Sequence, residues 1–183
     1  EANQKGASGL KLFKQFGLGY RNPDGSFMQI DDPRWDPIWR KCRELRFPVI
    51  IHTADPVAFF SPVDRFNERW MQLKRHPNWS FEGPQYPDRA ELLAQRNRVI
   101  ERHGQTTFIG AHMGNSAENL KLLTSLLAKY PNFHVDISGR VAELGRQPYS
   151  SRKFFIRFQD RILFGTDRYP GRLQQSRYRI YYR

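Results

Sequence analysis

Short apolar runs alternate with amphipathic stretches along the whole chain. The apolar runs predict five strands, at residues 10–16, 49–51, 107–111, 133–138 and 162–166. The stretches between them place apolar residues at helical spacing, which predicts helices. Because strands alternate with helices, the pattern indicates βα units, a parallel sheet and right-handed crossovers.

Polar residues that favour helix N-termini mark where the helices begin. Pro33 follows Asp32, and Glu91 stands three positions after Asp88 in a capping-box arrangement. The four predicted helices begin at or after Asp32, Asp88, Ser116 and Ser151.

Residues 53–87 form the longest stretch without a clear period. This segment is rich in aromatic side chains, and a loop of this length within a domain is usually functional or contains further helix. We expect residues 53–87 to lie over the active site as a long loop, and to act as a lid that shapes specificity.

Composition excludes several classes of protein. The chain has 183 residues, of which 39% are hydrophobic and 14% aromatic, enough for an ordinary core. The longest apolar run covers only residues 57–60, whereas a membrane-spanning helix needs roughly 18. The single Cys42 rules out an internal disulfide and fits a reducing compartment such as the cytoplasm.

The formal net charge of +12 is unevenly distributed. Residues 140–183 hold 11 basic and 3 acidic side chains, so most of the excess belongs to the last quarter of the chain. Clustered arginines can bind nucleic-acid phosphates, and a basic nucleic-acid-binding α/β domain is therefore one alternative. No nucleic-acid-binding motif accompanies the arginines, so we expect a solvated basic tail instead.

Chemically versatile side chains follow several of the predicted strands. His52 ends the second strand, His112 the third and Asp167 the fifth, while Arg140 follows the fourth. The carboxyl ends of parallel strands share one edge of a sheet, and ligands bind there in α/β folds. Imidazole nitrogen and carboxylate oxygen are also the ligand types of hydrolytic zinc sites. The sequence therefore predicts one polar site on this rim.

Five sequence strings, in this order, resemble the amidohydrolase-related family. That family lies within the metal-dependent TIM-barrel hydrolase superfamily, and aminocarboxymuconate-semialdehyde decarboxylase is a relative. The strings are GLKLFK from Gly9, PVIIHTADP from Pro48, TFIGAHMGN from Thr107, NFHVDIS from Asn132 and ILFGTD from Ile162.

The resemblance implies a metal-dependent active site in a (β/α)₈ barrel. His52, on the fifth barrel strand, would bind a divalent metal ion, for which Zn²⁺ is the leading expectation. His112, on the sixth, would orient or deprotonate the metal-bound water. Asp167, on the eighth, would bind the metal or its water and shuttle a proton.

One feature of the family is missing from this sequence. The family's His-x-His pair lies on the first barrel strand, and no His-x-His occurs here. The resemblance equates residues 9–16 with strand four. We therefore expect residues 1–183 to form an incomplete TIM-barrel domain, strands four to eight with their helices, that is inactive alone. The alternative fold is a five-stranded, flavodoxin-like open parallel sheet.

Two enzymatic hypotheses follow from the resemblance. The leading one is a metal-dependent hydrolase, in which metal-activated water attacks an amide, ester or lactone-type carbonyl of a small molecule. The other is a nonhydrolytic decarboxylase of an aromatic or unsaturated acid, with Lys14, Arg140 and Arg168 pairing with the substrate carboxylate. Neither hypothesis requires a membrane or a nucleic acid, and a homo-oligomer is left open.

Overall fold

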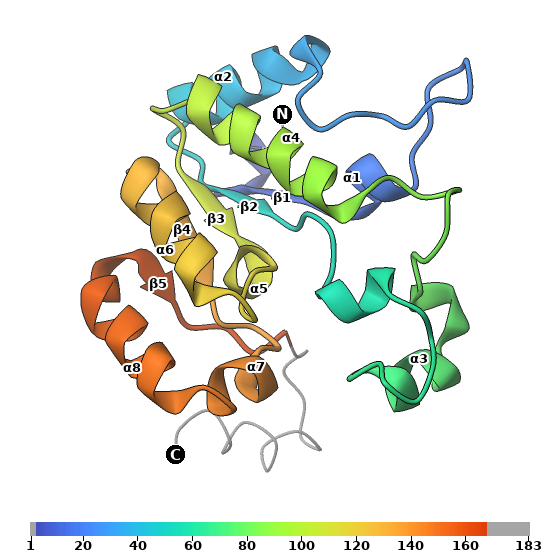
Figure 1. Ribbon diagram of the computed structural model, residues 1–183. Helices are drawn as coiled ribbons and strands as arrows, with labels where there is room; N and C mark the ends of the chain where they lie inside the picture. The colour runs from blue at the N-terminus through green and yellow to red at the C-terminus, as the bar shows by residue number, and fades with distance from the viewer. Residues whose placement is uncertain (1–2, 168–183) are drawn as a thin grey trace.

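A single parallel sheet organises the computed structural model, which describes residues 3–167 (Figure 1). Each predicted strand is present in this part of the chain. The strand at residues 49–51 matches its apolar run, and the other four are shorter than theirs. In sheet order, which is also chain order, they are β1 Leu10–Leu12, β2 Val49–Ile51, β3 Phe108–Gly110, β4 Phe133–Asp136 and β5 Ile162–Leu163.

The sequential strand order decides between the two predicted folds. A flavodoxin-like sheet has the order 2-1-3-4-5, whereas here each strand pairs in parallel with the next one along the chain. Right-handed crossovers that always step in one direction bring the connecting helices to one face of the sheet. Figure 1 shows α2, α4, α6 and α8 succeeding one another around the strands. This is the topology of successive units of a (β/α)₈ barrel. The flavodoxin-like strand order is therefore wrong, while the five-stranded open parallel sheet of that alternative is present.

Longer α-helices connect the strands, and shorter helical turns lie at their ends. The α-helices are α1 Gln15–Leu18, α2 Asp36–Glu44, α3 Trp70–Arg75, α4 Arg89–Arg102, α5 Ala111–Gly114, α6 Leu120–Lys129, α7 Val141–Gly145 and α8 Pro148–Arg157. The 3-10 turns are η1 Asn3–Lys5, η2 Pro33–Trp35, η3 Val57–Phe60, η4 Pro77–Trp79 and η5 Gln159–Arg161. Across residues 3–167, no helix has the length and apolar character needed to cross a membrane.

Two of the predicted helix starts are confirmed and two are shifted. Asp32 accepts from the backbone N–H of Arg34 at 2.9 Å, and Asp88 caps α4 in the same way. The expectation that Ser116 caps the next helix is wrong, because α6 begins only at Leu120 and Asn119 provides its cap. Helix α8 begins three residues before Ser151, at Pro148.

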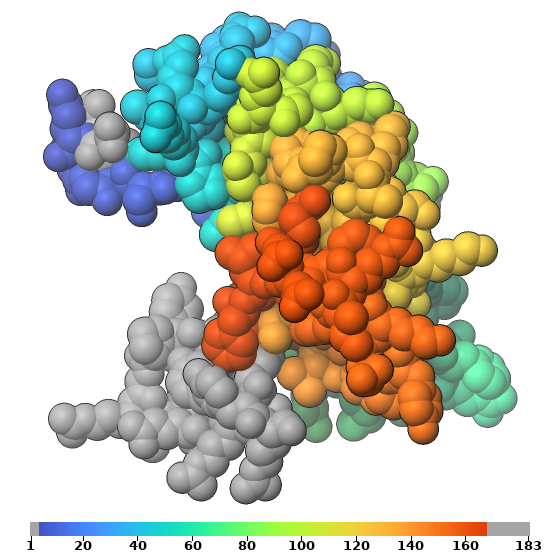
Figure 2. Space-filling model, turned by 90° about the vertical axis from the view of Figure 1, so that its left-hand side faces the viewer, coloured from blue at the N-terminus to red at the C-terminus, as the bar shows by residue number. Residues whose placement is uncertain are grey.

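The main core lies between the sheet and its helices. Strand side chains at alternating positions are fully buried, including Val49, Phe108 and Phe133, and they pack with Trp39 of α2 and Leu123 of α6. Intervening strand positions face the opposite side and are more exposed. The two outer strands lie at opposite edges of the sheet, and Figure 2 shows blue and red residues separated by the middle of the chain.

The segment 53–87 contains more helix than its sequence pattern predicts. It holds η3, α3 and η4, so it is a series of short helices joined by turns. The basic stretch at residues 140–183 lies outside the described residues from position 168 onward, and the nucleic-acid alternative that depends on this stretch stays untested.

Candidate active site

A cavity of about 590 Å³ opens at the carboxyl ends of the strands. Five of the six predicted site residues lie on the wall of this cavity. They are Lys14, His52, His112, Arg140 and Asp167. The sixth, Arg168, lies outside the described residues. The volume is within the range of small-molecule sites, roughly 300–1,000 Å³.

His52 contributes a buried imidazole immediately after β2. Its Nε2 atom is buried without a hydrogen-bond partner among residues 3–167, and Asp55 Oδ1 lies 3.7 Å away. The ring meets that of His112 edge to face, with 4.6 Å between centroids. A buried polar atom without a partner is costly, so His52 Nε2 is available for a ligand.

Asp55 is a cavity residue that our sequence interpretation missed. Lys14 Nζ donates to Asp55 Oδ2 at 2.5 Å, and both side chains are largely buried. Burial raises the pKa of Asp55, but the neighbouring His52 ring and the Lys14 charge outweigh this effect and hold the pKa below its usual value. Any substrate anion would compete with Asp55 for Lys14. The position of Asp55, three residues after His52, was the available signal.

His112 lies in a left-handed turn directly after β3. Its Nδ1 donates to the Ser138 carbonyl at 2.7 Å, because a carbonyl oxygen can only accept. This bond places the proton on Nδ1 and leaves Nε2 as the basic nitrogen. Burial lowers the pKa of His112, and the nearby His52 and Arg140 lower it further. A neutral imidazole with a basic nitrogen is suited to proton transfer.

Arg140 is a buried cation on the cavity wall whose hydrogen-bond partners are neutral. Its Nη2 donates to Asn115 Oδ1 at 2.8 Å and its Nη1 to the Gly139 carbonyl at 2.9 Å. Within residues 3–167, no carboxylate lies at ion-pair distance from Arg140. Burial lowers the pKa of Arg140, with Glu143 acting in the opposite direction. An anionic ligand group would therefore find a guanidinium that no carboxylate of residues 3–167 contacts directly.

Asp167 lies at the mouth of the cavity just beyond β5. Its side chain is exposed, and its backbone is left-handed with φ of 56°. The carboxylate raises the pKa of His112 in opposition to burial. Asp167 thus faces the same space as His112.

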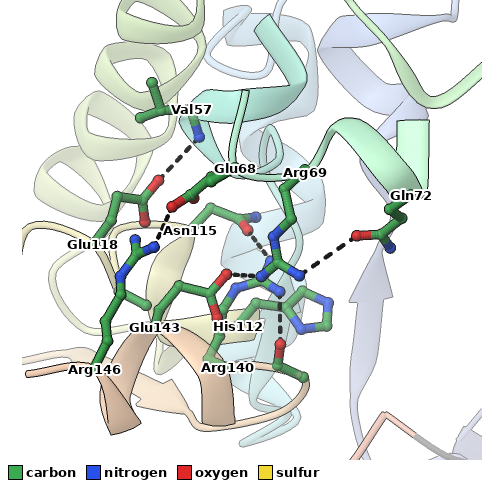
Figure 3. Close-up of polar contacts among 12 residues, drawn as sticks. Val57, Glu68, Arg69, Gln72, His112, Asn115, Glu118, Arg140, Glu143 and Arg146 are labelled. Carbon is green, nitrogen blue, oxygen red and sulfur yellow. Dashed lines mark hydrogen bonds and ion pairs between the residues drawn. The ribbon is translucent and has the colours of Figure 1, made fainter. Parts of the chain in front are cut away.

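The segment 53–87 supplies one wall of the cavity through aromatic and polar side chains. Two ion pairs fasten this wall to α7 and the residue after it, Arg69 with Glu143 and Arg146 with Glu68 (Figure 3). Glu143 is almost fully buried, and its Oε2 has no partner among the described residues. Our sequence interpretation missed both pairs, since no local pattern links such distant residues. Besides Asp55, the segment's wall residues are Pro56, Phe59, Arg69, Gln72 and Trp79.

The described residues fit a divalent metal ion by donor type, and they provide only part of a ligand set. His52 Nε2 and the Asp167 carboxylate are suitable donors on one cavity. Within residues 3–167, no three His, Cys, Asp or Glu side chains are grouped as a metal site. A catalytic zinc usually takes three protein ligands, so two candidate donors are insufficient.

Comparison with known proteins identifies the family. A sequence model of the amidohydrolases matches residues 1–181, and the chain belongs to this family. No curated protein sequence matches it significantly.

Solved structures with a related fold are distant in sequence. 2,6-Dihydroxybenzoate decarboxylase from Rhizobium is 21% identical with a TM-score of 0.53, over 91% of this chain and 53% of that one. A structure of 2,6-dihydroxybenzoate decarboxylase with 2,6-dihydroxybenzoate bound gives the same values. An uncharacterized TIM-barrel protein from Bordetella bronchiseptica is 20% identical with a TM-score of 0.47, over 77% and 40%.

The chain spans about half the length of the decarboxylase structures. At this level of identity the likeness concerns the fold alone. Together with the sequential parallel sheet, it confirms the predicted α/β class and the partial barrel.

Proposed function

We propose that the protein carrying this chain is a metal-dependent hydrolase that acts on a carbonyl group of a small molecule. The observation that carries this proposal is the orientation of His112. Its Nδ1 is fixed on the Ser138 carbonyl, which leaves a basic Nε2 on a cavity shared with His52 and Asp167. Membership of the amidohydrolase family supports the same reading.

His52 and Asp167 would hold the divalent metal ion, with Zn²⁺ as the leading expectation for nitrogen and oxygen donors. When bound, the ion would supply Lewis-acid polarisation of a substrate oxygen. Further ligands would come from outside residues 3–167.

Side chains of this chain would also transfer protons, bind the substrate and exclude water. His112 Nε2 would accept the proton of the attacking water, and Asp167 would carry that proton from His112 to the leaving group. Arg140 would hold an anionic group of the substrate, because its present partners are neutral. Phe59 and Trp79 would exclude water from the reacting bond.

Metal content and turnover, measured together, test this division of roles. The intact protein is loaded with Zn²⁺, analysed for bound metal and assayed on amides, esters and lactones. We expect His52→Ala to lower metal content, His112→Asn to keep the metal and lose rate, and Asp167→Asn to reduce both. His103→Asn is the matched control, because His103 pairs with Asp36 and neither residue lines the cavity. Full activity after removal of all divalent ions would refute the proposal.

Decarboxylation of an aromatic or unsaturated acid is the second candidate function. The observation that favours it is Arg140, a cavity cation without a carboxylate partner among the described residues. It could pair with a substrate carboxylate. The fold shared with 2,6-dihydroxybenzoate decarboxylase is compatible with this chemistry. Released CO₂, measured against hydrolysis products on the same panel, separates the two functions.

A further inference from the structure

The residues that present His112 form an uncommon backbone structure. Residues 112–115 all have positive φ, between 50° and 58°, and only Gly114 among them is a glycine. A left-handed conformation costs a non-glycine residue roughly 1–2 kcal/mol, so the turn must be held by its surroundings. Backbone bonds at the turn include those from the N–H groups of Asn115 and Ser116 to the carbonyls of His112 and Met113.

Two arginines of α4 donate to consecutive carbonyls of this turn. Arg96 Nη1 donates to the Gly114 carbonyl at 2.5 Å, and Arg89 Nη2 donates to the Asn115 carbonyl. The two arginines are seven residues apart, which places them two turns apart on one face of α4. Helix α4 therefore supplies hydrogen-bond donors to the last two carbonyls of the turn that carries His112.

Arg96 is the more unusual of the two. Its side chain is fully buried, its other hydrogen bonds go to Asn97 Oδ1, and its guanidinium lies 5.2 Å from the centre of the Phe133 ring. No carboxylate pairs with Arg96 in the described part of the chain. Burial lowers the pKa of Arg96 to about 9, so the group stays charged at neutral pH.

Close packing leaves Arg96 little freedom. A Cβ atom added at Gly114 would lie 3.2 Å from Arg96 Nη1 and 3.2 Å from the Phe133 ring. Burying an unpaired charge is expensive, and aliphatic side chains of similar volume would fill the same space at lower cost. The feature that such side chains lack is the set of donors aimed at the turn.

We propose that Arg96, assisted by Arg89, is a positioning residue that holds the left-handed turn and thereby fixes the His112 ring on the Ser138 carbonyl. The importance of this for catalysis rests on the proposed function. The positioning itself does not, because the orientation of the His112 ring can be measured without turnover.

The test is nitrogen-15 NMR of the full chain labelled at histidine, with His112 assigned through His112→Asn. In the wild-type protein we expect Nδ1 of His112 to carry a slowly exchanging proton. In Arg96→Met, which keeps the length and removes the donors, we expect this proton to exchange fast. Arg98→Met is the matched control, since Arg98 is on the same helix, half-exposed and paired with Asp31 and Glu91.

Asn97→Ala provides a milder variant if Arg96→Met does not fold. It removes the acceptor that orients Arg96 while leaving every turn carbonyl in place. We expect faster exchange of the same proton. A folded Arg96→Met or Asn97→Ala protein with the wild-type His112 signal overturns the proposal, as does an equal change in Arg98→Met. If Arg96→Met speeds the exchange of this proton but the wild-type protein hydrolyses none of the tested substrates, the positioning proposal stands. That result would contradict the proposed function alone.

Discussion

The backbone N–H of His112 donates to Asp136 Oδ1 at 2.9 Å, and the same oxygen accepts from the backbone N–H of Ser138 at 2.9 Å. The Asp136 carboxylate, at the end of β4, thus connects the turn that carries His112 to the loop whose carbonyl accepts the hydrogen bond from His112 Nδ1. This shared acceptor sets the distance between the two partners of the His112–Ser138 hydrogen bond.

Replacing Asp136 should therefore loosen both partners together. We expect Asp136→Ala to lower the free energy of unfolding by about 3 kcal/mol, because two hydrogen bonds to a charged group are lost. Asp136→Asn is the matched control, since its amide oxygen can still accept, and it should cost less. Urea denaturation measures both values. Equal losses in the two variants would contradict the shared-acceptor argument.

The Lys14–Asp55 pair gives a second prediction. Its side chains are only 17% and 7% exposed, so Lys14→Met leaves a buried carboxylate without its strongest partner. We expect a loss of about 3 kcal/mol in the free energy of unfolding. The double variant Lys14→Met, Asp55→Leu removes both charges and should recover most of that loss. If the double variant is no more stable than the single one, buried charge is not the cause.

His134 makes stability depend on pH. Burial lowers the pKa of His134 below its ordinary value of 6.5, and the charge of Arg161 lowers it further. The unfolded chain therefore takes up the proton more readily than the folded one. The stability that neutral His134 contributes is fully present above pH 6.5, and it is lost as the pH falls below 6.5 through the lowered pKa of the folded state.

The measurement is urea unfolding at pH 7.5, 6.5 and 5.5. We expect the free energy of unfolding to fall across this series, and to fall less in His134→Gln, which cannot take up a proton. His112 contributes to both slopes, so their difference isolates His134. Ser125→Ala, on the exposed side of α6, should keep the wild-type slope. Identical slopes in wild type and His134→Gln would contradict this prediction.

The sheet and the residues of its rim could be predicted because each depends on local pattern. A buried run such as Val49–Ile51 identifies its own strand, and parallel strands necessarily end on one edge. That rule alone predicted that His52, His112 and Asp167 share one site, and all three line one cavity.

The left-handed turn and the Lys14–Asp55 pair could not be predicted in this way. The turn is stabilised by Arg96, 16 positions before His112, and by Asp136, 24 positions after it. A window of local sequence contains neither relationship. The same turn delays the following helix, which explains why Asn119 and not Ser116 provides its cap.

The two ion pairs that fasten the cavity wall differ greatly in burial, and this contrast yields the last prediction. The Glu143 side chain is 1% exposed and that of Arg69 is 24% exposed, whereas Arg146 and Glu68 are 48% and 38% exposed. Exposed pairs contribute roughly 0–1 kcal/mol, because water screens them and side-chain entropy opposes them. Removing one partner of a buried pair costs about 3–5 kcal/mol, because the other charge is left without compensation.

We therefore expect Arg69→Met to release the segment and Glu68→Gln to leave it in place. Hydrogen exchange of the backbone amides in residues 57–79 is the measurement, with unfolding free energies recorded beside it. Arg69→Met should speed exchange throughout this stretch, while Glu68→Gln should match the wild type. The double variant Arg69→Met, Glu143→Leu should recover stability without restoring slow exchange, because the buried charge is gone and the link to α7 is still missing. Slow exchange in Arg69→Met would mean that aromatic packing, including the Phe59–Trp79 stack, holds the wall without the buried ion pair.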